Sequence, residues 1–287
     1  MSTKEIEFED CFPTSFRDLG NGYTKAFVTF IDILGFRDII QNEPPDIVNQ
    51  KLDAMSLFSS LPQMRAAEHT EDLALPIVIQ FSDSIIRIQP ASGEDELSIA
   101  RGYFGELSSL TLMQGNLVCN GILIRGGLTY GDVCVREGRV FGPAFNRAYA
   151  IESSLARYPR ILIDEFLTLN NGDNPIVSQV GSASWTQMQS DIFEYLDRAE
   201  DGQWILDYLP HLFQAERSNN ISCKDVLFAH RDSIVELLKK SMKSGKEEPK
   251  AKIRWMANYH NKIINRSFSK LRDDSDKTQD SLIIDLN

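Results

Sequence analysis

Strand-like and helix-like spacing of apolar residues alternates between about residues 24 and 165. Residues 25–34 (KAFVTFIDIL) form a continuous apolar run that stops at Gly35, which predicts a buried central strand. From Phe36 to about residue 68 the spacing is helical, and Pro44–Pro45 divides it into a short and a longer helix. Residues 75–80 and 85–89 then predict a hairpin whose turn contains Asp83.

The same alternation continues through the second half of this region. A helix is predicted over residues 94–114, and a second helix is predicted to open at Gly142–Pro143 and to run to about residue 158. Further strands are predicted at 118–130, 131–136, 139–141 and 160–164. The order β-α-β-β-α-β predicts an α+β domain with the split βαβ arrangement of the ferredoxin-like fold.

The flanking regions have a different texture. Residues 1–23 lack clean periodicity and are interpreted as a lead-in segment, so the α+β domain is expected at 24–165. Residues 166–287 are expected to form a mainly helical carboxyl-terminal extension. A turn is predicted at Asn170–Asn174, and helices are predicted at 187–201 and within 227–272. Residues 273–287 are interpreted as a frayed acidic tail. The basic face of the 227–272 region is either a solvated face of packed helices or a regulatory or partner-binding surface.

Composition narrows the class of protein. The chain has 287 residues, of which 42% are hydrophobic, enough for a real core. No apolar run approaches the roughly 20 residues of a membrane span and the amino terminus lacks a secretory signal, so we expect a cytoplasmic protein with no membrane partner. The net charge of -11 argues against nucleic acid as a general partner. Four scattered cysteines predict reduced thiols rather than disulfides or a zinc site.

Two isolated aspartates are candidates for chemistry because of where they fall. Asp32 lies near the end of a strand that is otherwise apolar, and Asp83 lies at the turn of a hairpin expected in the same sheet. Two close carboxylates repel unless they share a cation, and Mg²⁺ and Mn²⁺ prefer carboxylate and carbonyl oxygens. The alternative is that each acid caps a turn or pairs with an arginine.

The residues around these acids resemble the class III nucleotidyl cyclases. Residues 30–36 (FIDILGF) are similar to that family's FxDIxGF signature, and Phe81-Ser82-Asp83 falls where the family has its second metal-binding aspartate. Residues 126–131 (GGLTYG) look like the family's next strand, and residues 141–146 (FGPAFN) resemble its WGxxVN segment. The resemblance runs from about residue 24 to 164 and implies a ferredoxin-like cyclase domain.

The resemblance also implies roles for individual residues. Asp32 and Asp83 would hold two divalent metal ions, Mn²⁺ or Mg²⁺, with the Ile33 carbonyl as a further ligand. Gly35 and Phe36 would offer backbone amides to the phosphates, and Asn146 would orient the ribose. The family's sites lie between subunits, which implies a head-to-tail homodimer.

A phosphatase with Asp32 as nucleophile is disfavoured because position 34 is Leu, where that chemistry usually has a second acid.

The chain departs from the family at the positions that read the base. The lysine and the aspartate of the purine-using members are replaced by Ile79 and Arg139. An arginine donor suits the carbonyl of uracil or cytosine, so these changes predict an altered substrate.

A second departure concerns the family's transition-state arginine, whose place is taken by Ala150. Arg147, Arg125 and Arg157 are alternative sources of positive charge on the triphosphate, and Arg147 is predicted as a substrate contact.

Both departures, with the chain length and the helical extension, resemble the pyrimidine cyclases of bacterial anti-phage systems of the Pycsar type. This resemblance implies UTP as first-choice substrate and CTP as second, and a cyclic nucleotide that acts on a separate downstream effector. A purine cyclase and a catalytically inactive cyclase-like nucleotide-binding module remain as alternatives.

Overall fold

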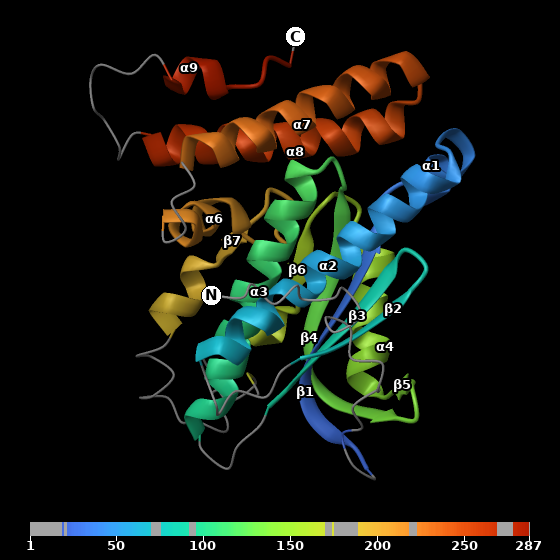
Figure 1. Cartoon of the computed structure of the whole chain (residues 1–287). Coiled ribbons are helices and arrows are strands. Elements are labelled where there is room, and N and C mark those ends of the chain that lie inside the picture. Colours follow the sequence, from blue (N-terminus) through green and yellow to red (C-terminus); the bar gives the residue numbers. More distant parts are fainter. Residues whose placement is uncertain are drawn as a thin grey trace, which may run out of the picture.

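A mixed sheet of eight strands organises the protein in the computed structural model, which describes residues 19, 22–69, 76–91, 96–169, 174, 189–217, 223–268 and 278–286 (Figure 1). Its strands are β1 Thr24–Ile33, β2 Ile77–Phe81, β3 Ser84–Pro90, β4 Ile124–Arg136, β5 Arg139–Phe141, β6 Ile161–Ile163, β7 Leu196–Arg198 and β8 Trp204–Leu206. The helices are α1 Phe36–Asn42, α2 Pro45–His69, α3 Glu96–Cys119, α4 Pro143–Ala150, α6 Tyr208–Arg217, α7 Cys223–Ser244, α8 Glu247–Phe268 and α9 Thr278–Leu282, with helical turns η2 Ile151–Leu155 and η3 Glu165–Thr168.

The first four strands confirm the predicted ferredoxin-like order. They lie side by side as β2-β3-β1-β4 and every neighbouring pair is antiparallel. The connections from β1 to β2 and from β3 to β4 carry helices, which is the split βαβ arrangement. The strand β1 is therefore central, and its last residues are hydrogen-bonded into β3 on one side and β4 on the other.

Alternation along β1 separates the two faces of the sheet. Phe27 and Ile31 point into the main core, which includes residues of α2 and α3, whereas Ala26 and Val28 join a smaller core with residues of α4. The chain of β4 approaches α4 and η2 closely at Gly127. A Cβ there would lie 2.6 Å from Ile151 Cβ and 2.8 Å from the Ala148 carbonyl oxygen, so the close packing requires glycine.

The sheet continues beyond residue 165. Residues 189–194 are helical as predicted, but the predicted helix to residue 201 is wrong because β7 and β8 form a hairpin there. Its turn contains Gly202, with a φ of 80°, and β8 pairs with β6 through Leu162 and Ile205. The segment forms strands because the edge of β6 offers backbone groups for pairing, and this distant partner cannot be recognised from the local spacing of apolar residues.

Other boundaries differ by smaller amounts. The strand predicted from residue 118 starts at Ile124, because α3 runs on to Cys119. The helix predicted from Pro143 ends at Ala150 and continues as the wider turn η2, and the two helices predicted from Phe36 are α1 and α2. The lead-in segment lies outside the described residues except for 19, 22 and 23, and of the turn cluster Asn170–Asn174 only Asn174 is described.

The carboxyl-terminal helices α7 and α8 lie side by side at one end of the molecule, with α9 against them (Figure 1). Of the frayed tail predicted at 273–287, the described residues 278–286 are packed instead, because Leu282 and Ile284 are buried in the main core. Asn261 holds Ile284 by both backbone groups, with contacts of 2.9 Å each. Burial of this apolar end outweighs the acidic character of the segment.

A chain of buried hydrogen bonds also fixes α9. The Leu282 carbonyl contacts His260 Nε2 at 3.0 Å, His260 Nδ1 contacts His230 Nδ1 at 2.9 Å, and His230 Nε2 contacts the Tyr208 hydroxyl at 2.7 Å. Since the carbonyl only accepts, His260 donates from Nε2, His230 donates from Nδ1, and Tyr208 donates its proton to His230. With this arrangement every hydrogen bond of the series is satisfied while both imidazoles are neutral. Burial favours the neutral form, because it lowers the pKa of His260 to about 4.

Two further expectations concern the whole chain. Among the described helices, none combines the length and apolar character needed to cross a bilayer. Within the described residues, Cys119 and Cys134 form no disulfide, and the Cys119 thiol contacts the Val226 carbonyl at 3.9 Å.

Candidate active site

Asp32 is the penultimate residue of β1 and lies on the sheet face that carries α4. In the strand register it is opposite Ser84 of β3 and Arg125 of β4. The Ser84 hydroxyl donates to one carboxylate oxygen at 3.0 Å, and an Arg125 guanidinium nitrogen lies 3.4 Å from the other. The Asp32 side chain keeps 19% of its surface exposed, so the carboxylate is anchored from both sides and still reachable from solvent.

Asp83 approaches Asp32 because of the turn between β2 and β3. Ser82 adopts a φ of 54°, and the Ile33 amide donates to the Asp83 carbonyl at 3.1 Å. This bond ties the end of β1 to the hairpin turn. The Asp83 carboxyl raises the pKa of Asp32 both by its charge and by a side-chain hydrogen bond, so the structure brings the two predicted acids together.

A third carboxylate joins them from η2. The close contact at Gly127 lets η2 pack against the sheet, and Glu152 of η2 reaches Arg125, with 2.8 Å between Arg125 Nε and Glu152 Oε1. The two atoms form an ion pair whose angle is not that of a hydrogen bond. Sequence reasoning missed Glu152, although an acid among the apolar positions of a packed segment was a signal for it.

The cluster carries more negative charge than its one arginine offsets. Burial, followed by the charge of Asp83, raises the pKa of Asp32 from 3.8 to about 6, against the lowering effects of Ser84 and Arg125. Burial also raises the pKa of Glu152 from 4.5 to about 7, opposed by Arg125 and reinforced by Asp32 and Asp83. Such a cluster favours an added cation.

The donor set fits magnesium or manganese bound together with a substrate. Within the described part of the chain, no three His, Cys, Asp or Glu side chains form a ready-made metal cage. Mg²⁺ usually needs no such cage, since it binds through one or two carboxylates, waters and the phosphates of a substrate. Asp32 and Asp83 provide two carboxylates at one point, and Ile33 lies beside both in the chain.

Gly35 and Phe36 follow directly, at the start of α1. Gly35 has a φ of 80°, in the left-handed region that favours glycine, and Phe36 is buried. The turn therefore reverses the chain immediately after the acids, and it places the start of α1 next to them.

The remaining predicted residues lie on β5 and α4. Arg139, in β5, pairs with Arg136 at the other end of β4 from Arg125, roughly 35 Å along the strand, and 78% of its side chain is exposed. Asn146 is exposed on α4. Arg147 donates two hydrogen bonds of 2.8 Å to Asp164, whose buried carboxylate also accepts from the Thr129 hydroxyl at 2.8 Å. Arg147 is thus engaged within the chain.

Comparison with known proteins gives distant similarity only. No protein-family model and no curated protein matches the chain. Among solved structures, the guanylyl cyclase Cya2 is similar at 17% identity and a TM-score of 0.40, over 57% of this chain and 81% of that one. The catalytic core of a rhodopsin-guanylyl cyclase with converted specificity, in complex with ATPαS, is similar at 15% identity and a TM-score of 0.43, over 64% of this chain and 97% of that one. A bacterial light-regulated adenylyl cyclase is similar at 18% identity and a TM-score of 0.31, over 50% of this chain and 77% of that one. These scores are too low to assign a family, so the residues and their geometry must support any function.

Proposed function

We propose that the chain is a metal-dependent nucleotide cyclase that converts UTP, or CTP as second choice, to the 3′,5′-cyclic monophosphate and pyrophosphate. The observation that carries the proposal is the meeting of Asp32 and Asp83 at adjoining ends of β1 and the β2–β3 turn, with the pKa of Asp32 raised to about 6. The order of the cyclase-like motifs along the predicted elements adds support.

The reaction joins the ribose 3′-oxygen to the α-phosphorus and breaks the bond from that phosphorus to the oxygen that leaves with pyrophosphate. Two divalent ions, when bound, would lower the pKa of the 3′-hydroxyl and neutralise the triphosphate. Asp32 and Asp83 would hold these ions, with the Ile33 carbonyl. Gly35 and Phe36 would offer backbone amides to the phosphates, at the turn that follows the acids.

Arg125 is the cationic side chain that we assign to the triphosphate. It lies 3.4 Å from Asp32 and is partly exposed, so it can turn from the acids to a phosphate once cations replace it. Arg147 is less suited because both of its hydrogen bonds to Asp164 would have to break. This assignment offers a source of positive charge where Ala150 leaves none.

A second copy of the chain would complete the site. Arg139 and Asn146, which we assign to the base and the ribose, are exposed, and Arg139 lies beyond the far end of β4 from the acids. Exposed aromatic residues accompany each part of the site, namely Phe81 beside the turn, Phe141 beside Arg139 and Tyr149 beside Asn146. A head-to-tail dimer would bring both halves of the site together.

The substrate assignment depends on what replaces the purine-reading residues. Ile79 packs against the smaller core of the sheet and offers no hydrogen bond to a base. The exposed guanidinium of Arg139 can donate to a pyrimidine carbonyl. A role as the source of a second messenger in bacterial anti-phage defence, acting on a separate effector, follows from the resemblance to the pyrimidine cyclases.

The test is to incubate the protein separately with ATP, GTP, CTP and UTP plus Mn²⁺ and to identify products by mass. We expect cyclic UMP or cyclic CMP in excess over purine products. Abundant cyclic AMP or cyclic GMP would replace the substrate assignment with a purine cyclase. No cyclic product from any of the four would favour the inactive nucleotide-binding module, for which Ala150 is the specific observation.

A further inference from the structure

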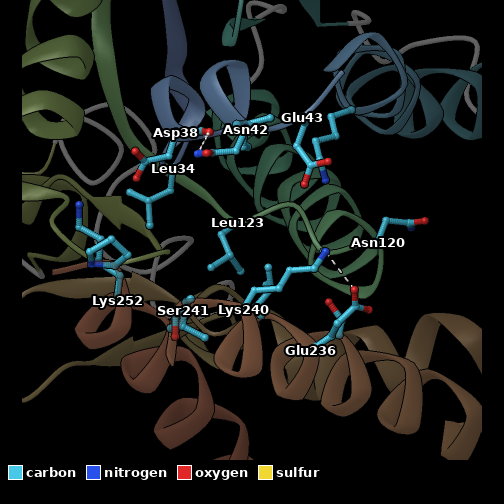
Figure 2. Close-up of a pocket in the computed structure, with 18 of the residues that line it drawn as sticks. Leu34, Asp38, Asn42, Glu43, Asn120, Leu123, Glu236, Lys240, Ser241 and Lys252 are labelled. Atoms are coloured by element: carbon cyan, nitrogen blue, oxygen red, sulfur yellow. Dashed lines mark hydrogen bonds and ion pairs between the residues drawn. The ribbon is translucent and has the colours of Figure 1, made fainter. Parts of the chain in front are cut away.

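A cavity of about 860 Å³ separates the carboxyl-terminal helices from the turn that follows Asp32. Its walls come from α1 and the start of α2, from the end of α3, and from α7 and α8 (Figure 2). The volume is within the range of small-molecule sites, which occur preferentially between packed units of a fold. None of the active-site acids lines it, although Gly35, which we assign to the phosphates, lies at its edge.

The centre of the cavity is apolar. Leu34 and Leu123 line it from the sheet domain, and Figure 2 shows Leu123 near its middle and Leu34 beside Asp38. Leu237 and Ile253 line it from α7 and α8. Leu34 and Leu237 are only partly buried, so apolar surface faces the space and would favour the apolar body of a ligand.

The rim contains five carboxylates and three lysines, Lys51, Lys240 and Lys252, and helix ends add to its negative side. The carboxyl-terminal ends of α1 and α3 both reach the cavity, at Asn42 and Cys119, and neither helix has a basic residue in its last turn. Each end therefore presents a partial negative charge that its own helix does not offset. The amino-terminal end of α8, which also borders the cavity, carries Glu247 and Glu248 in its first turn.

Glu43 differs from the other carboxylates that line the cavity. Four of the five lining carboxylates have basic partners, in the pairs Asp38–Lys246, Asp232–Arg231, Glu236–Lys240 and Glu248–Lys252. Glu43 is half-buried directly after α1, and no ion pair forms on it within the described residues. A carboxylate in that place is unfavourable beside the negative helix end, unless a cation joins it.

We propose that this cavity binds a small organic cation with an apolar body, its ammonium or amidinium group at Glu43 and its body against Leu34, Leu123 and Leu237. The second part of the proposal, which rests on the proposed function, is that binding of this cation changes the affinity of Asp32 and Asp83 for metal ions. Leu34 and Gly35 line the cavity two and three residues after Asp32. The Leu34 amide donates to the Leu123 carbonyl at 2.8 Å, next to the bond from Ile33 to Asp83, so one short segment joins the cavity to both acids.

The binding test uses three probes that differ only in the polar end: phenylbutylamine, phenylbutanol and phenylbutanoate. Titration calorimetry should give a Kd on the order of 0.1–1 mM for the amine and binding about tenfold weaker or worse for the other two. Glu43→Gln should weaken the amine about tenfold, whereas the matched exposed control Glu200→Gln should leave it unchanged. Leu237→Trp should narrow the apolar part of the cavity and weaken amine binding, with an unchanged far-ultraviolet circular dichroism spectrum as evidence of folding.

Absence of amine binding, equal binding of the three probes, or an unchanged affinity in Glu43→Gln would each overturn the site. The coupling is measured separately, as Mn²⁺ affinity by electron paramagnetic resonance with and without the amine. A change of about threefold or more in wild type, lost in Glu43→Gln, is the expected result. Amine binding without any change in Mn²⁺ affinity would overturn the coupling and leave the site. Because calorimetry needs no turnover, a failure of the cyclase assay does not decide the site.

Discussion

Two clusters of arginine and carboxylate side chains lie on opposite faces of the same sheet, and they are built differently. In the main core, Arg87 and Glu106 are fully buried and form two hydrogen bonds of 3.0 and 3.1 Å, and the Thr29 hydroxyl donates to Glu106 at 2.8 Å. One cation meets one anion there. At the candidate active site, Arg125 pairs with both Asp32 and Glu152, and Asp83 adds a third carboxylate beside them.

The difference separates a structural from a functional role. A buried pair that is balanced and fully hydrogen-bonded has no use for a ligand, whereas a cluster with surplus negative charge is stabilised by an added cation. The surplus lies at the end of β1, where solvent reaches it. Variants that change the charge of each cluster therefore have opposite expected effects on stability and on activity.

The largest expected effect is on activity. Asp32→Asn should lower cyclic nucleotide formation with Mn²⁺ by about a thousandfold or more, because one carboxylate cannot hold both ions in place. The free energy of unfolding should stay the same or rise, since the change removes like-charge repulsion. Product formation is measured by mass and stability by urea denaturation. Full activity in this variant would contradict the metal assignment.

The next effect is on stability. Arg87→Met should lower the free energy of unfolding by about 3–5 kcal/mol, because it leaves the Glu106 carboxylate buried without its partner. Urea denaturation of the single variant and of Arg87→Met/Glu106→Leu measures this. The double variant should recover most of the loss, since no buried charge remains. Equal stability of single and double variants would show that the cluster is not balanced as described.

The smallest effect is the pH dependence of stability without metal. The folded-state pKa of Asp32, about 6, exceeds its ordinary value of 3.8, and that of Glu152, about 7, exceeds 4.5. Between these values the folded state binds more protons than the unfolded state, so stability falls as pH rises from about 4 to 7. We expect a loss on the order of 2 kcal/mol in EDTA from Asp32.

The control for this measurement is Asp32→Asn, because the neutral pair His230 and His260 acts in the opposite sense. Burial lowers the pKa of both imidazoles, so their contribution is lost as pH falls below about 6.5. The difference between wild type and variant isolates Asp32, and excess Mn²⁺ at pH 7.5 should reduce it. A wild-type stability profile parallel to that of Asp32→Asn would contradict the raised pKa.

The sequence by itself determined the elements and their order. The apolar run of β1, the proline break between α1 and α2 and the hairpin around Asp83 are local patterns, and periodicity within a few residues is enough to specify them. The placement of Asp32 and Asp83 at the ends of neighbouring strands followed from the same patterns. Their role as metal ligands remains a prediction.

Only the tertiary structure decided which distant groups meet. Arg125 is 93 positions from Asp32, and Glu152 reaches Arg125 because Gly127 lets η2 pack tightly on the sheet. The pairing of β8 with β6, the docking of α9 and the position of Glu43 at a cavity likewise depend on partners far along the chain. Local spacing specifies which face of an element is buried, but the neighbour that covers that face is selected by packing across the whole fold.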